Sequence, residues 1–120
     1  MVSGASEVAD PARDFAIQLE RTTDLLRALP IDRLTRVESD GLSIADRAFE
    51  LSMSFVIKAK EIDDLAPTGP LPRLAPHAVG DQVAVTGQAL VASAAHSNDN
   101  GTADVLAWAS DECRKFRQRL

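Results

Sequence analysis

Residues 41–62 read GLSIADRAFELSMSFVIKAKEI, and this stretch decides the fold. Its apolar residues recur in steps of three and four, which places them on one face of an α-helix. The series consists of Ile44, Ala48, Leu51, Phe55, Ala59 and Ile62. Ser43, followed three residues later by Asp46, resembles a capping box, so the helix is predicted to begin there and to reach Ile62.

Three further stretches repeat apolar residues at the same spacing. They predict helices over residues 10–29, 77–95 and 102–120. Residues 67–76 hold four prolines and predict a stiff extended connection. The sequence therefore predicts an all-α fold, a four-helix bundle with a proline-rich crossover between the second and third helices. At about 3.1 Å per residue the connection can run the length of the bundle or wrap across one end, and both arrangements stay open.

The composition is that of one ordinary folded domain. The 120 residues are 45% hydrophobic and 26% charged, which predicts a single domain over residues 10–120 behind a flexible N-terminus of residues 1–9. The net charge of −5 argues against binding to nucleic acid or anionic membranes. No apolar run is long enough for a transmembrane helix, and the start of the chain does not resemble a signal peptide, so a cytoplasmic location is expected.

The helix over residues 43–62 has more apolar surface than one packing face needs. Its apolar arc covers about 200°, against about 100° for an ordinary surface helix. Phe49, Met53 and Val56 form the second face, which either meets another chain or packs on a second neighbour within the bundle. Trp108 falls opposite the core series of its own helix and is a further interface candidate, unless the proline connection or the N-terminal arm covers it.

The sequence lacks the usual patterns of a catalytic or metal-binding site. His77 and His96 have no ligand-spaced histidine partner and are expected to be surface or capping residues. Cys113 lies on a core series, where a buried thiol is inert. Gly80 and Gly87 lie seven residues apart on one helix face, which favours either a close approach of another helix or a ligand pocket. No cofactor and no catalytic residue is predicted.

One segment resembles a known family. Residues 25–30 and the stretch that runs from Gly41 to Leu51 are similar to the first half of the DinB-like helical proteins, which include the mycothiol-dependent maleylpyruvate isomerases. The resemblance covers about residues 15–55 and implies a helical bundle. The family has a metal-binding histidine where this chain has Glu50, so the ligand pattern is not retained. Glu50 is a candidate metal ligand, or it forms a solvated pair with Arg47.

The sequence favours a small interaction or scaffold module without catalysis that forms a homodimer or binds another protein. Its predicted interface consists of Phe49, Met53, Val56 and Trp108. One alternative is a degenerate DinB-like metal- or thiol-dependent transferase that uses Glu50 with His77 or His96. The other alternative is a bundle that binds a small ligand.

Overall fold

The computed structural model of the chain describes residues 10–67, 69–97 and 101–120, and most of these residues lie in helices. These ranges contain five α-helices, one 3₁₀ turn and no strand, which confirms the predicted all-α class. The α-helices are α2 (Pro11–Ala28), α3 (Ile31–Thr35), α4 (Ile44–Ile62), α5 (Val79–His96) and α6 (Thr102–Gln118), and the 3₁₀ turn η1 spans Pro76–Ala78. None of the described helices is long and apolar enough to cross a membrane. The predicted N-terminal arm lies outside the described residues.

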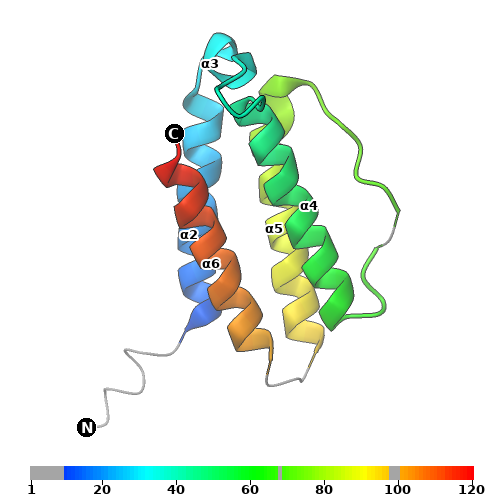
Figure 1. Ribbon diagram of the computed structural model, residues 1–120. Coiled ribbons are helices and arrows are strands. Elements are labelled where there is room, and N and C mark those ends of the chain that lie inside the picture. The colour runs from blue at the N-terminus through cyan, green and yellow to red at the C-terminus, as the bar shows by residue number, and fades with distance from the viewer. Residues whose placement is uncertain (1–9, 68, 98–100) are drawn as a thin grey trace, which may run out of the picture.

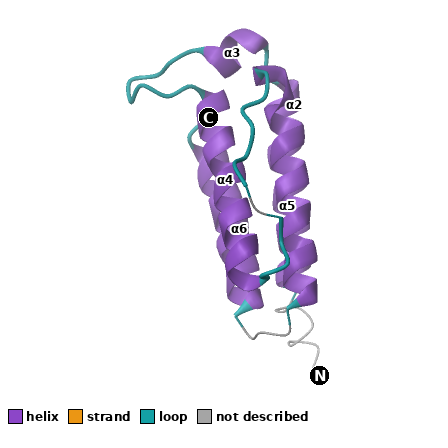
Figure 2. Cartoon of the chain, turned by 90° about the vertical axis from the view of Figure 1, so that its right-hand side faces the viewer, coloured by secondary structure: helices purple, strands orange, loops and turns teal. Residues whose placement is uncertain are grey.

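The four long helices lie side by side in two parallel pairs. Figure 1 shows α2 and α6 running in one direction and α4 and α5 in the other. Helix α4 packs mainly against α5, α2 packs against α6, and α2 also contacts α5. Residues 63–67 and 69–75, which we call the strap, contain no helix and lead from the end of α4 back along the helices to η1 (Figures 1 and 2). The strap brings the chain back to the end of the molecule at which α4 begins, so α5 starts there too and runs parallel to α4.

Local sequence signals account for the helix starts. The hydroxyl of Ser43 accepts a hydrogen bond from the Asp46 backbone N–H at 3.0 Å, and the Asp46 carboxylate accepts one from the Ser43 N–H at 2.9 Å. These reciprocal bonds are the predicted capping box. At α2, the Asp10 carboxylate accepts a hydrogen bond from the Arg13 N–H at 3.0 Å, and proline takes the first helical position.

Phe55 lies at the centre of the core and joins three helices. Its ring is fully buried on α4 and meets Phe15 of α2 edge-on, with 5.4 Å between ring centroids. On the other side it meets Trp108 of α6, also edge-on, at 6.3 Å. Such edge-to-face pairs are favourable beyond the area that they bury. The rest of the core is aliphatic except for Phe116 and Cys113, and most of it comes from the four long helices.

The two glycines of α5 allow α2 to approach closely. A Cβ atom added at Gly87 would lie 2.6 Å from both methyl carbons of Leu19. A Cβ at Gly80 would lie 3.1 Å from the Cγ of Arg27. The predicted close approach is therefore present, and Leu19 and Arg27 also line a cavity of about 460 Å³ between α2 and α5.

Candidate functional site

The second apolar face of α4 divides into a covered part and an exposed part. Phe49 is half-buried, and the Arg73 guanidinium of the strap lies 4.5 Å from its ring centroid. Val56 is also half-buried and lines a cavity beneath the strap. Met53 remains 39% exposed, and Ile57, one turn further along, is 53% exposed. The strap thus covers two of the three α4 residues that the sequence marked as an interface, and leaves Met53 open.

Trp108 is half-buried and faces α4. Its ring packs edge-on against Phe55, and the Lys58 Nζ lies 5.3 Å from the ring centroid in a cation–π contact. The contacts that cover Trp108 therefore come from a neighbouring helix, which the sequence did not suggest. These contacts with α4 explain how a large aromatic side chain can lie opposite the main core series of α6 without being covered by a second protein.

The strap is fastened to α4 and α5 near its middle. The Nε2 of Gln82 donates a hydrogen bond to the Pro72 carbonyl oxygen at 2.7 Å. Arg73 forms an ion pair with Asp46, with 2.5 Å between Nη2 and Oδ1. Asp46, Arg73 and Gln82 line an upper cavity of about 270 Å³ under the strap, and a lower cavity of about 250 Å³ lies under residues 66, 67 and 69–71. The lower cavity is lined almost wholly by apolar residues, whereas the upper one combines apolar with polar side chains.

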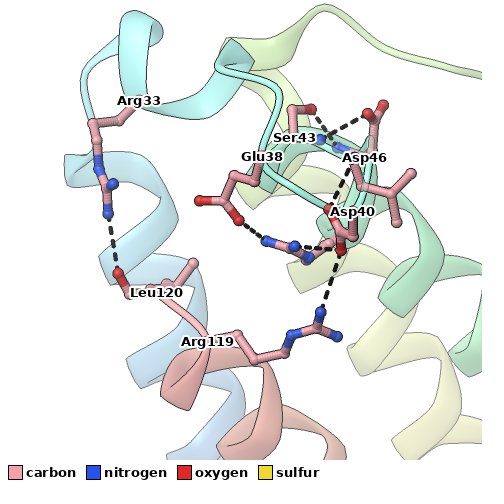
Figure 3. Close-up of polar contacts among 9 residues, drawn as sticks. Arg33, Glu38, Asp40, Ser43, Asp46, Arg119 and Leu120 are labelled. Carbon is pink, nitrogen blue, oxygen red and sulfur yellow. Dashed lines mark hydrogen bonds and ion pairs between the residues drawn. The ribbon is translucent and has the colours of Figure 1, made fainter.

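A network of ion pairs fixes the loop before α4 (Figure 3). Arg47 is only 9% exposed, and its guanidinium binds Glu38 on one side and Asp40 at 2.5 Å on the other. Asp40 also lies 3.3 Å from the Nη2 of Arg119 at the end of α6. The hydrogen bond from Arg47 and one from the Leu42 backbone N–H lower the pKa of Asp40. The predicted pair between Arg47 and Glu50 is wrong, because Arg47 turns away toward the loop.

The candidate metal ligands do not come together. Glu50 is exposed on α4 and has no ion pair within the described chain. His77 lies in η1 and His96 ends α5, so the histidines mark opposite ends of α5. The His96 Nδ1 lies 3.7 Å from the Asp63 Oδ2. Within the described ranges no three His, Cys, Asp or Glu residues are grouped so as to hold a metal ion.

Cys113 is fully buried, as its place in the core series predicted. Burial raises the pKa of its thiol to about 11, although a hydrogen bond with Thr22 acts in the opposite direction. The thiol is therefore protonated at neutral pH and is a poor nucleophile.

A polar seam between α2 and α6 was not predicted. The Arg117 Nη1 donates to the Gln18 carbonyl oxygen at 3.0 Å and to the Thr22 hydroxyl at 2.9 Å. Arg114 forms an ion pair with Asp14 at 2.8 Å. A usable sequence signal is the presence of polar residues on the core face of α2 together with two arginines three residues apart on α6.

No protein-family model, curated protein or solved structure matches this chain. What the surfaces of the chain can bind is therefore inferred from their own chemistry.

Proposed function

We propose that this chain is a non-catalytic interaction module, a four-helix bundle with the strap as its crossover, and that it pairs with a second copy of itself through α4. The exposed face of α4 carries this proposal. Glu50, Met53, Ile57 and Lys60 follow one another in steps of three, four and three residues. This spacing forms a straight stripe on a helix and is typical of helix–helix seams.

The stripe is complementary to itself. When two α4 helices pack antiparallel about a two-fold axis midway between Met53 and Ile57, Met53 of each copy lies opposite Ile57 of the other. The same axis places Glu50 opposite Lys60, so an acidic group faces a basic group at each end of the apolar centre. A two-fold interface requires this kind of self-complementarity. Glu50 supports the pairing further, because it is exposed and has no ion pair within the described chain.

The size of the stripe predicts a weak dimer. Full burial of a side chain such as Met or Ile contributes about 1.5–3 kcal/mol. Met53 and Ile57 are already about half covered in one copy, so the four side chains of a dimer contribute about 3–6 kcal/mol. Association costs at least about 4 kcal/mol.

Sedimentation equilibrium between about 10 and 500 µM protein tests the proposal. We expect a reversible dimer that Ile57→Glu removes, because a charge would face Met53 of the second copy. Val85→Glu is the matched control, since Val85 is 63% exposed but lies on α5. Glu50→Lys is expected to weaken the dimer, and adding Lys60→Glu is expected to restore it.

Two results would contradict the proposal. A monomer over the whole concentration range removes the dimer. A dimer that survives Ile57→Glu but is lost with Val85→Glu shows that another surface pairs.

A further inference from the structure

The cavity between α2 and α5, which we call the α2–α5 groove, has the size of a small-molecule site. Its volume of about 460 Å³ falls within the usual range of ligand pockets. Its apolar lining consists of Ala16 and Leu19 from α2 and of Ala84 and Val91 from α5. Leu19 is buried, and Val91 is half-buried and packs against the core. An apolar group that binds here therefore lies on covered side chains of the helix seam and loses contact with water.

The charged residues that line the groove are Glu20, Asp24 and Arg27, and all three belong to α2. Arg27 is already paired across the helices. Its Nη2 lies 2.7 Å from the Asp81 Oδ1 of α5, and its Nε donates to the same oxygen at 2.9 Å. Asp81 is not among the residues that line the groove, so the pair offsets the charge of Arg27. The groove is left with a negative edge formed by Glu20 and Asp24.

The two carboxylates of this edge are placed to act together on one cation. Glu20 and Asp24 lie four residues apart on α2, so they are neighbours on the helix surface, with about 5–6 Å between their Cβ atoms. Both are exposed, and neither carboxylate has an ion pair or hydrogen bond within the described chain. Like charges at this spacing repel each other, whereas an ammonium group has three N–H donors and can bond both.

We propose that the α2–α5 groove binds a small organic cation in which one ammonium group is joined to an apolar body. The ammonium lies between the carboxylates of Glu20 and Asp24, and the apolar body lies on the floor around Leu19. Both parts contribute, so an uncharged molecule of the same shape and a cation without an apolar body bind more weakly. The site is separate from the pairing of α4, because the groove is lined by residues of α2 and α5.

Three compounds test the site on the unmodified chain. Phenethylamine has both parts, phenethyl alcohol replaces the ammonium group by a hydroxyl, and ethylamine lacks the ring. Nuclear magnetic resonance titration measures the three affinities, and backbone amide signals of residues 19–24 and 84–91 should shift with phenethylamine. We expect phenethylamine to bind at least about threefold more tightly than either of the others, as one or two exposed ion pairs predict for the alcohol. Added salt should reduce the advantage over the alcohol.

Two matched variants test the negative edge. Glu20→Gln combined with Asp24→Asn removes both charges at nearly constant size, and is expected to lower phenethylamine affinity to that of phenethyl alcohol. Asp32→Asn combined with Asp104→Asn removes the same net charge from exposed positions on α3 and α6 that do not line the groove. This control is expected to leave phenethylamine affinity unchanged.

The apolar floor has its own pair of variants on α5. Ala84→Leu fills part of the groove and is expected to weaken both phenethylamine and phenethyl alcohol, whereas Ala89→Leu fills part of the lower cavity and is expected to weaken neither. Equal affinity for the amine and the alcohol, no binding of phenethylamine at millimolar concentration, or an equal loss in the two charge variants would each overturn the inference. The comparison of compounds needs no variant, so it decides even if a variant does not fold.

Discussion

Replacing Gly87 by alanine tests whether α2 and α5 are as close as the structure places them. Alanine is favoured over glycine in a helix by about 1 kcal/mol, so the change would stabilise an open site. At Gly87 the new Cβ would lie 2.6 Å from both methyl carbons of Leu19. Carbon atoms pack at about 3.5–4.0 Å, so the overlap is about 1 Å. Leu19 is buried but also lines a cavity of about 460 Å³ between α2 and α5, so its methyl groups must leave their packing and turn toward this cavity to make room.

The steric term should exceed the helix preference. Overpacking a core by one carbon costs about 1–3 kcal/mol, and moving both methyl groups of Leu19 out of their packing falls within that range. Subtracting the helix preference of about 1 kcal/mol leaves a net loss of up to about 2 kcal/mol for Gly87→Ala. Urea unfolding monitored by circular dichroism measures this difference as a shift of the midpoint at constant slope.

Gly80→Ala is the matched control on the same helix face. Its Cβ would lie 3.1 Å from the Cγ of Arg27, whose side chain is 48% exposed and able to shift, but also 3.3 Å from the Cβ of the buried Leu26 and 3.4 Å from the backbone oxygen of Thr23. The helix preference and this smaller steric cost should nearly cancel, so we expect Gly80→Ala to change the free energy of unfolding by less than about 0.5 kcal/mol. In a Leu19→Ala background, Gly87→Ala should become stabilising, because the overlapping methyl groups are gone. The close approach is refuted if Gly87→Ala costs no more stability than Gly80→Ala in the unmodified chain.

Three further predictions concern acid stability, thiol reactivity and the aromatic core. The lowered pKa of Asp46 means that its stabilising contribution is present above about pH 4 and is lost as pH falls through the folded-state value. Unfolding free energies measured from pH 7 down to about pH 2.5 should fall at the acid end, and less so in Asp46→Asn. Cys113 should react with a thiol reagent only as fast as the protein opens, because its thiol is buried. A reaction rate in the native protein equal to that of the unfolded chain would contradict this, because the thiol would then be accessible. Phe55→Leu removes two edge-to-face contacts, so it should cost about 1–3 kcal/mol and shift the fluorescence emission of Trp108.

The helices were predictable because their signals are local. The capping pair of Ser43 and Asp46, and the prolines on either side of residue 68, mark where helices begin and where none can form. The path of the strap was not predictable, because proline fixes the backbone conformation but not the direction of the segment. That direction depends on contacts distant in sequence, such as the bond from Gln82 to Pro72.

The burial of Arg47 shows a second limit of sequence reasoning. On a helical projection Arg47 lies on the polar arc of α4, which predicts a solvated side chain. The turn at Gly41 has a φ of 85°, a backbone conformation that favours glycine. It folds the preceding loop back, so that Glu38 and Asp40 reach Arg47. Two acidic residues directly before a glycine, followed by a helix with an arginine in its first turn, are a usable signal for this arrangement.

The wide apolar arc of α4 is explained in three parts, and only one of them enters the two proposals made for this chain. One part packs on the bundle through Phe55, a second lies under the strap through Phe49 and Val56, and the third is the exposed stripe around Met53 and Ile57. Pairing of two copies uses the third part, whereas the α2–α5 groove is lined by residues of α2 and α5. Ile57→Glu should therefore abolish the dimer and leave phenethylamine affinity unchanged, and Glu20→Gln combined with Asp24→Asn should do the reverse. If each variant impaired both properties, both would act through a general loosening of the bundle, and neither surface could be assigned a separate role.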